Sequence, residues 1–431
     1  MLLIYTQKIT PRITYVFKHI CTRILGIEIK FTSVIEDLIA HPGPKLSYGK
    51  QPLGNELFVQ SEDLLVQQGF EAIDIIVKDW EDTKCFFSMS ASSALPFDIF
   101  SASFFLMSRY EEYLPHVKDA QGRFPATESL AYKEKFLQFP VVDIWAYKFK
   151  AILSKHFPEL IFTEEKVKIH TLIEARRPFA YSEQGFLRSL LGYGSDIWKL
   201  KMGSVARRTK VILGLRRDPF NTFKWIINTS KSSKSKLSVF FLLGEGLVFR
   251  ESLNTQRRKF NMLVKYVGDY IEVGLIFSFA SLHNYDSLKK EKKRIEDMTN
   301  RTLLSSMNAQ FMVNLPEIYR HLVELEVERD FTMVYHNMAG FRAGTCTPFL
   351  FYDLDSETKT PLIIHPIAMT TDVFKNKYDA EIYKIFNTIF DTVKELNGTF
   401  SMLFTNLDFV ASDKNKTWRT IFSEKLQKYE D

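Results

Sequence analysis

A carboxylate, a cation and an imidazole in this sequence are spaced where they could do chemistry. Glu174 and Arg176 are two residues apart in the segment 170–181, HTLIEARRPFAY. On a strand both side chains would point to the same face, as a structural ion pair or as an anion-binding or acid/base pair. His365 follows the short apolar run 362–364. At a strand end its imidazole could act as a general acid, or it could be a hydrogen-bonded structural histidine.

Further polar residues in the second half of the chain extend this set. Arg342 lies in GFRAGT, and Asp353 lies in PFLFYDL a few residues later. A buried arginine needs an anionic partner, so we expect Arg342 to pair with Glu174 or Asp353. His283 and His336 have no second histidine at metal-ligand spacing. We expect both to lie in loops or on the surface.

Two charged segments have ordinary structural interpretations. Arg109, Glu111 and Glu112 close the segment 96–114, where a salt-bridged helix end at a domain junction is expected. The basic stretch 199–217 could contact phosphates or anionic lipid, but it lacks interleaved aromatics and any nucleic-acid motif. A solvated helical face is the preferred interpretation, and no nucleic-acid partner is expected.

Composition bounds the class of protein. The chain has 431 residues, of which 45% are hydrophobic and 25% charged, with a net charge of +6; two domains are the default for this length. Cys21, Cys85 and Cys346 are far apart, which favours a reducing compartment without disulfides. No targeting segment is evident, and the apolar runs are too short to span a bilayer. We therefore expect a cytoplasmic protein without a membrane span.

Hydrophobic periodicity divides the chain into units of residues 1–165 and 166–431. In the first unit we expect helices at 13–25, 96–114 and 144–156, and strands at 56–59 and 72–77. In the second we expect strands at 167–173, 237–243, 270–276, 331–335, 362–365 and 399–404, with a short one near Leu303. Helices are expected between them at 179–191, 256–266, 285–298, 316–325 and 380–396, and at 416–428. Alternating strands and helices favour a parallel sheet or an α/β barrel, with chemistry at the carboxyl ends of the strands.

The order of several motifs resembles a known family. They are LPFDIFSASFFLMSRYEEYLP, GRFPATESLAYKEKFLQFPVVDIWAYK, LGLRRDPFNTFKW, FFLLGEG, EVGLIFSFAS, DFTMVYHNMAGFRAGTCTPFLFYDL and IIHPIAM. This order is similar to Bacteroidetes proteins in which an uncharacterised N-terminal domain precedes a polysaccharide deacetylase (NodB-homology) domain. The resemblance covers nearly the whole chain, and GFRAGT followed by PFLFYDL is its most specific part.

The resemblance implies an α/β protein, with an α+β N-terminal domain of unknown role (residues 1–165) followed by a NodB-like distorted (β/α) barrel (residues 166–431). It also implies a divalent metal such as zinc, held by an aspartate and histidines, and a water that hydrolyses the N-acetyl group of a sugar. Such a metal lowers the pKa of its bound water to about 7. A second carboxylate usually acts as general base.

The sequence departs from that family at the metal-binding motifs. An ungapped alignment from Gly185 places Glu174 and Arg176 at the family's Asp-x-Asp motif. Ile276 stands where Gly-Leu-His-Pro-Ser has its histidine, and segment 308–310 replaces an Arg-Gln-His stretch. Thr405-Asn406 replaces the closing His-Asn motif. Together these changes predict that no metal and no other cofactor is bound.

Other positions of the family pattern are retained. Arg342 stands where the family has an arginine near its catalytic carboxylate, and Asp353 and His365 are kept. Glu174 and His365 are therefore the candidate catalytic residues, although neither is assigned, and Arg176, Arg342, Asp353 and Asn406 are the expected pocket residues.

The sequence predicts a catalytically degenerate, deacetylase-like protein. Its expected role is to bind a carbohydrate, such as an acetylated sugar, or a protein partner in surface-polysaccharide metabolism. The alternative is an active carbohydrate N-deacetylase or other hydrolase that uses non-standard metal ligands or none. That alternative requires Glu174 and His365 to reach a common point, whereas the binding role predicts that Glu174 and Arg176 touch and block the barrel mouth.

Overall fold

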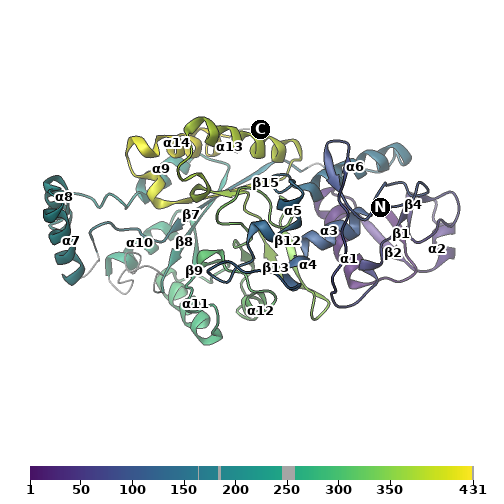
Figure 1. Ribbon diagram of the computed structural model, residues 1–431, viewed down its shortest axis with the longest axis horizontal. Coiled ribbons are helices and arrows are strands. Elements are labelled where there is room, and N and C mark those ends of the chain that lie inside the picture. Colours follow the sequence, from purple (N-terminus) through teal and green to yellow (C-terminus); the bar gives the residue numbers. More distant parts are fainter. Residues whose placement is uncertain (164, 183–185, 245–257, 430–431) are drawn as a thin grey trace.

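The computed structural model describes residues 1–163, 165–182, 186–244 and 258–429, and Figure 1 shows its arrangement. The strands are β1 (Leu2–Tyr5), β2 (Ile29–Thr32), β3 (Lys45–Gly49), β4 (Leu57–Gln60), β5 (Lys78–Trp80), β6 (Thr83–Cys85), β7 (Lys168–Ala175), β8 (Lys236–Leu242), β9 (Glu272–Phe277), β10 (Ser305–Asn308), β11 (Arg329–Asp330), β12 (Phe349–Asp353), β13 (Thr358–Ile364), β14 (Met369–Thr370) and β15 (Thr399–Thr405). The α-helices are α1 (Pro11–Phe17), α2 (Ile35–Ala40), α3 (Ile99–Met107), α4 (Tyr110–Tyr113), α5 (Leu130–Lys133), α6 (Val141–His156), α7 (Phe186–Trp198), α8 (Met202–Ile212), α9 (Phe223–Ser230), α10 (Arg258–Gly268), α11 (Tyr285–Thr299), α12 (Glu317–Glu324), α13 (Asp379–Glu395) and α14 (Lys416–Thr420). None of the helices in these ranges has the length and apolar character needed to cross a bilayer.

The N-terminal part is built on a small sheet with the strand order β2-β1-β3-β4, in which all neighbours are parallel. Thr10 caps α1 by accepting a hydrogen bond from the Ile13 amide, and Pro11 occupies the first turn, where its missing N–H costs nothing. Asp98 caps α3 and also accepts a 2.6 Å hydrogen bond from the Tyr48 hydroxyl on β3. All residues of α3 are buried. The cap therefore fixes a fully buried helix against the sheet.

The C-terminal part is a distorted (β/α) barrel. Its sheet has the order β12-β13-β11-β10-β9-β8-β7-β15-β14, and all neighbours are parallel except the β12–β13 hairpin. Segment 358–370 closes the barrel, because Ile363 and Ile364 pair with β11, and Met369 and Thr370 at its end pair with β15. Between these pairings the His365 amide donates to the Asp330 carbonyl at 2.9 Å, and the Ala368 amide donates to the Ser401 carbonyl at 2.9 Å. The α+β part followed by a barrel agrees with the predicted fold class.

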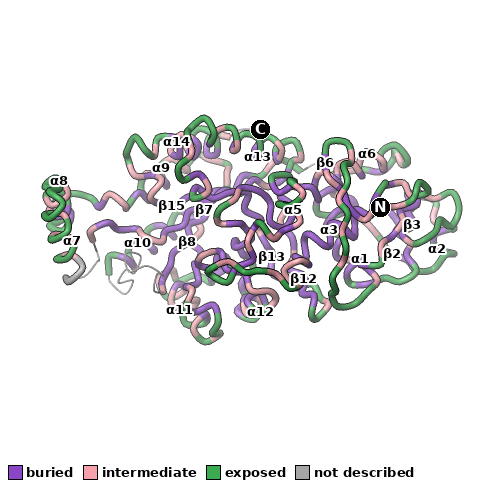
Figure 2. The backbone as a smooth tube through the Cα atoms, viewed as in Figure 1, coloured by how far each residue is buried: buried purple, intermediate pink, exposed green. Residues whose placement is uncertain are grey.

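The barrel interior is filled with apolar side chains. Its buried cluster contains Leu172, Phe240, Leu242, Ile276, Met307, Ala309, Phe311, Phe331, Val334, Ile367 and Leu403. Strands β7 to β10 and β15 contribute to this cluster, and on β8 the contributing residues are two apart, as the two-residue repeat of a strand requires. A second, larger cluster lies outside the barrel and extends from Leu2 to Leu426, so the N-terminal part and the barrel share one continuous core (Figure 2).

Several predicted elements differ from the observed ones. The predicted strand 72–77 is irregular, and the N-terminal strand β1 has no counterpart among the predicted strands. The predicted strand 331–335 is not observed, and the short strand β11 lies immediately before it. The predicted helix 179–191 begins only at α7. The predicted helix 256–266 is observed as α10, although its first two residues lie outside the described ranges.

The predicted helix 96–114 is broken into α3 and α4 at Arg109, which has the left-handed φ of 54°. This conformation is unusual for a residue with a side chain and requires support from its surroundings. The buried contacts of Arg109, described below, supply that support.

Candidate functional site

The carboxyl end of β7 carries the predicted pair Glu174 and Arg176. His170, Leu172 and Glu174 alternate along β7, and Leu172 belongs to the interior cluster, so Glu174 faces the barrel interior at its mouth. Glu174 is buried, with 4% of its surface exposed. The Arg176 Nε donates to Glu174 Oε1 at 2.8 Å, and the two side chains form an ion pair. The predicted contact between them is therefore present.

The mouth does not offer the donors that a divalent metal needs. Ile276 is completely buried in the apolar cluster. The side-chain Nδ2 of Asn308 donates a 2.9 Å hydrogen bond to the Met312 carbonyl. The Arg176 cation lies against the carboxylate of Glu174. Zinc-like ions take imidazole, thiolate or carboxylate ligands. Among the described residues no three His, Cys, Asp or Glu side chains converge, so these residues do not fit a metal at the family's position.

Asn406 connects loops around the mouth. Its Nδ2 donates to the Arg177 carbonyl at 3.0 Å and to the Phe220 carbonyl at 2.9 Å. Its own carbonyl accepts a 2.9 Å hydrogen bond from the Thr222 hydroxyl. Asn406, predicted as a pocket residue, is buried. In this geometry it holds together the segments that follow β7, α8 and β15.

The N-terminal part reaches the same end of the barrel. Arg123 donates from Nη1 to the Gln310 carbonyl at 2.9 Å, beyond the end of β10. Its Nη2 lies 3.2 Å from His336 Nε2, and its Nε donates to Asp119 at 2.7 Å. His336 lies in a loop, as predicted, but it is half-buried against Arg123. Residues of the N-terminal part thus border the mouth.

Arg342 does not pair with Glu174 or Asp353, so that prediction is wrong. Its guanidinium binds both oxygens of Glu112, with Nε–Oε1 at 2.9 Å and Nη2–Oε2 at 2.7 Å. Arg109 also donates to Glu112 Oε1 at 2.7 Å and pairs with Glu111 at 2.9 Å. Burial alone would raise the pKa of Glu112, but Arg342 and Arg109 outweigh it and lower the pKa to about 2. The predicted salt-bridged helix end is confirmed, and Arg342 belongs to it.

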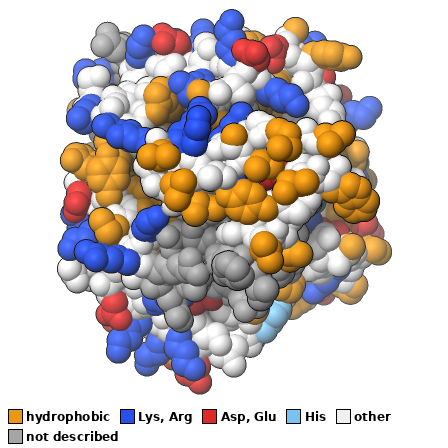
Figure 3. All heavy atoms as spheres, turned by 90° about the vertical axis from the view of Figure 1, so that its left-hand side faces the viewer, with side chains coloured by type: hydrophobic (Ala, Val, Ile, Leu, Met, Phe, Trp, Pro, Cys, Tyr) orange, Lys and Arg blue, Asp and Glu red, His pale blue; other side chains and the backbone are white. Residues whose placement is uncertain are grey.

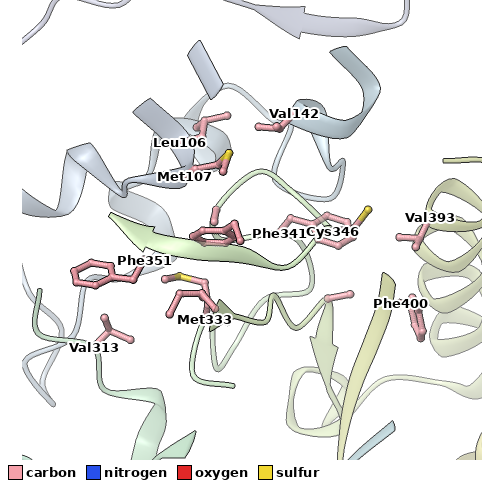
Figure 4. Close-up of a cluster of buried hydrophobic side chains, with 14 of the residues drawn as sticks. Leu106, Met107, Val142, Val313, Met333, Phe341, Cys346, Phe351, Val393 and Phe400 are labelled. Atoms are coloured by element: carbon pink, nitrogen blue, oxygen red, sulfur yellow. The ribbon is translucent and has the colours of Figure 1, made fainter. Parts of the chain in front are cut away.

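The GFRAGT motif is a docking segment for the N-terminal part. The Phe341 amide donates to the Leu137 carbonyl at 2.8 Å, and the Val142 amide donates to the Gly344 carbonyl at 3.0 Å. The Cys346 amide donates to Asp143 at 2.9 Å. Figure 4 shows the apolar side of this contact, where Leu106, Met107 and Val142 face Phe341 and its neighbours. The most specific motif of the sequence therefore joins the two parts.

Asp353, another predicted pocket residue, lies on the β12–β13 hairpin. It accepts from Arg320 Nε at 2.6 Å and Nη2 at 2.9 Å, and it caps the turn at the Asp355 amide. Arg320 belongs to α12. Asp353 therefore attaches this helix to the hairpin and does not reach the barrel mouth.

His365 lies at the opposite end of the barrel from Glu174. Its ring stacks on Phe331 with centroids 4.5 Å apart, and its centroid is 6.0 Å from that of His170. His170 lies near the start of β7, four residues before Glu174, which is about 13 Å along a strand. Leu172 lies between them on the same face. Glu174 and His365 therefore do not reach the common point that the enzyme alternative requires.

A cavity of about 700 Å³ opens at this amino-terminal end, and we call it the base cavity. His170 and His365 line it, together with Tyr429 and a set of polar residues. Its cationic residues are Arg23, Lys166, Lys168, Lys234 and Lys236, and its acidic residue is Glu165. Glu165 pairs with Lys168 at 2.7 Å. The cavity is therefore strongly electropositive.

A hydrogen-bonded network supports the base cavity from the barrel interior. His170 Nε2 lies 2.9 Å from the Ser238 hydroxyl, which donates to Glu272 at 3.3 Å. Glu272 also pairs with Arg329 at 3.0 Å and Lys236 at 3.3 Å. Burial and the nearby positive charges lower the pKa of His365 to about 3 and hold the pKa of His170 well below its usual value. Both imidazoles are therefore neutral at pH 7.

A known family and several solved structures match parts of the chain. Residues 2–158 match DUF7033, a family of unknown function. The chain is similar to a candidate polysaccharide deacetylase from Mycobacterium smegmatis, with 9% identity and a TM-score of 0.39 over 62% of this chain and 86% of that chain. It is also similar to a CE4-family pseudoenzyme from Bacillus anthracis, with 12% identity and a TM-score of 0.30 over 62% of this chain and 63% of that chain. A polysaccharide deacetylase from Bacillus cereus is similar with 10% identity and a TM-score of 0.29 over 61% of this chain and 87% of that chain. No match was found among curated proteins.

Sequence reasoning misses two parts of the site. It indicates Glu112 only as part of a helix end, because nothing in the sequence places it against Arg342, 230 residues away. His170 could be found from its position, since it shares the face of Glu174 on a predicted strand. No sequence motif indicates the base cavity, because its cations come from segments scattered between Arg23 and Lys236.

Proposed function

We propose that this chain is a catalytically degenerate, polysaccharide deacetylase-like protein that binds a carbohydrate or protein partner in surface-polysaccharide metabolism. The motif order supports the deacetylase-like assignment. The proposed loss of catalysis is supported by the barrel mouth, where Glu174 is paired with Arg176 and Ile276 is buried among apolar side chains. A carboxylate neutralised by a guanidinium is a poor metal ligand and a poor general base. A cytoplasmic location is part of this proposal.

The first test is metal content after dialysis against zinc or cobalt, measured in parallel with turnover of N-acetylated sugar oligomers. We expect no stoichiometric metal and no turnover above that of a heat-denatured sample. About one ion per chain, with turnover, would instead support the alternative of an active N-deacetylase with non-standard ligands. In that case Glu174→Gln and His365→Gln should be compared, because the two residues lie at opposite ends of the barrel and only one end can hold the reaction.

The base cavity supports the binding role. Its volume of about 700 Å³ lies within the range of small-molecule sites, about 300–1,000 Å³. Cations, neutral imidazoles and the ring of Tyr429 together suit a sugar that carries a phosphate or carboxylate group. We therefore place the proposed carbohydrate ligand in the base cavity, away from the mouth.

Calorimetric titration with N-acetylglucosamine 6-phosphate and with N-acetylglucosamine tests this placement. We expect the phosphorylated sugar to bind at least about tenfold more tightly, because charge-assisted hydrogen bonds are worth about 1.5–3 kcal/mol each. Lys234→Ala, in the cavity wall, should remove most of that preference. Lys375→Ala, a surface lysine paired with Asp372, is the matched control and should leave it unchanged. Equal affinity for both sugars would contradict the placement without affecting the metal test.

A further inference from the structure

The helices α7 and α8 form a hairpin that projects from the barrel (Figure 1). Within it we consider residues 189–217, called the α7–α8 hairpin below. Its root is fixed by Asp218, whose carboxylate accepts from the Ala180 amide at 2.7 Å and the Tyr181 amide at 2.8 Å. The hairpin is therefore attached to the barrel at both ends.

The two helices hold each other through polar contacts. Arg208 is buried, pairs with Asp196 at 2.8 Å, and its guanidinium lies 4.8 Å from the ring centroid of Tyr181 and 5.4 Å from that of Tyr193. Gly192 admits it, because a Cβ there would lie 2.3 Å from Arg208 Nη1. The Tyr193 hydroxyl lies 2.9 Å from that of Thr209 on the facing helix. This polar packing leaves many apolar side chains of the hairpin facing outwards.

The outward side of the hairpin is apolar. Its exposed large hydrophobic residues are Leu190, Leu191, Ile197, Trp198, Leu200, Met202, Ile212, Leu213 and Leu215. Trp198 and Leu200, at the turn between the helices, are 89% and 85% exposed. Figure 3, which faces this end of the molecule, shows hydrophobic side chains in a band with Lys and Arg around it. An apolar surface this extensive indicates a binding surface.

The hairpin carries a net positive charge. Its basic residues are Lys199, Lys201, Arg207, Arg208, Lys210, Arg216 and Arg217, and its acidic residue is Asp196. Asp196 is neutralised by Arg208, whereas the other six cations are exposed. Around the turn, residues 198–202 read WKLKM, so exposed apolar side chains alternate with exposed lysines. The apolar surface and the positive charge therefore occupy the same part of the molecule.

We infer that the α7–α8 hairpin binds the surface of an anionic lipid bilayer, with Trp198 and Leu200 inserted at the level of the headgroups. Amphipathic helices with tryptophan and leucine on one side and lysine and arginine beside them lie in this interface. Tryptophan favours the headgroup level, and each lysine near an anionic surface strengthens binding about fivefold. The preferred sequence-based interpretation, a solvated helical face, does not account for so many exposed apolar side chains. This contact is peripheral and does not require a membrane span.

Co-sedimentation of the full chain with vesicles tests the inference. One set contains one part phosphatidylglycerol to two parts phosphatidylcholine, and the other contains phosphatidylcholine alone. We expect binding to the anionic vesicles and at least about fivefold weaker binding to the neutral ones. Trp198→Ser/Leu200→Ser should weaken binding to the anionic vesicles about tenfold or more, since both apolar side chains are lost. Lys199→Glu/Lys201→Glu should remove the preference for anionic lipid.

The matched control is Tyr378→Ser, which removes another large side chain that is 85% exposed, outside the hairpin. This variant should bind as the unchanged protein does. All substituted residues are exposed, so the melting temperatures should agree and exclude unfolding as the cause. No sedimentation with anionic vesicles, or equal binding by Trp198→Ser/Leu200→Ser, would overturn the inference. A concentration-dependent dimer that this double variant abolishes would also overturn it, because a second copy would then occupy the surface.

Discussion

Glu112→Ala is expected to lower the free energy of unfolding by about 3–5 kcal/mol, the cost of leaving a buried ion pair without one partner. Arg342 and Glu112 are both almost fully buried, at 2% and 4% exposed, and Arg342 has no other carboxylate partner among its described contacts. Arg109 retains Glu111 at 2.9 Å, so the loss falls mainly on Arg342. Urea unfolding followed by circular dichroism gives the value.

A double variant separates the lost charge pair from the lost packing. Glu112→Ala/Arg342→Met should recover a large part of the stability, because it removes the uncompensated cation together with its partner. Glu128→Ala is the matched control, since Glu128 forms a partly exposed pair with Lys133 at 3.6 Å. Such pairs contribute about 0–1 kcal/mol. A loss below about 1 kcal/mol for Glu112→Ala would show that the Glu112 cluster does not stabilise the junction.

Gly340→Ala, in the same docking segment, is the second substitution with a large expected effect. Gly340 has φ of 140°, and a Cβ there would lie 2.3 Å from the Leu137 carbonyl oxygen and 2.8 Å from its carbonyl carbon. These are backbone atoms, and hydrogen bonds of 2.8 Å from Phe341 and 2.7 Å from Gly340 hold the segment on both sides. Neither side can move without breaking them. We expect a loss of about 3 kcal/mol or more from the clash and the disfavoured φ together.

Gly214→Ala isolates the contribution of φ. Gly214 has φ of 75°, and a Cβ added there would meet no atom within 4 Å, so only the left-handed backbone is penalised, by about 1–2 kcal/mol. Both variants should be compared by urea unfolding under the same conditions. If Gly340→Ala is no worse than Gly214→Ala, the backbone of Leu137 yields easily and the junction is less tightly packed than the structure indicates.

Glu112→Ala and Gly340→Ala both test GFRAGT as the segment that docks the N-terminal part. The family resemblance places Arg342 near a catalytic carboxylate, whereas in this chain its carboxylate comes from the N-terminal part. Gly340 and Gly344 allow close approach to Leu137 and Leu106 of that part. In this chain the motif therefore joins the two parts of the protein.

The sequence alone determined the elements whose signals are local. The apolar run LSVFFLL predicts β8 because a strand buried on both faces requires it. The strand predicted at 167–173 is observed as β7. The two-residue spacing of Glu174 and Arg176 predicts that they share one face, and their ion pair is observed. Helices such as α11 and α13 follow from their periodicity within a residue of the predicted bounds. The alternation of strands and helices favours a parallel sheet or an α/β barrel, and the family resemblance implies the barrel.

Only the tertiary structure decided what depends on partners distant in the sequence. Helix 96–114 breaks at Arg109 because its guanidinium binds the Arg342 carbonyl, and local propensity carries no information about that contact. His365 lies at the base rather than the mouth because segment 358–370 crosses from β11 to β15 as it closes the barrel, so its level is set by those two strands. The base cavity and the exposed side of the α7–α8 hairpin likewise arise from packing. Burial is a property of the whole fold, and a sequence reports it only where it follows the period of a helix or a strand.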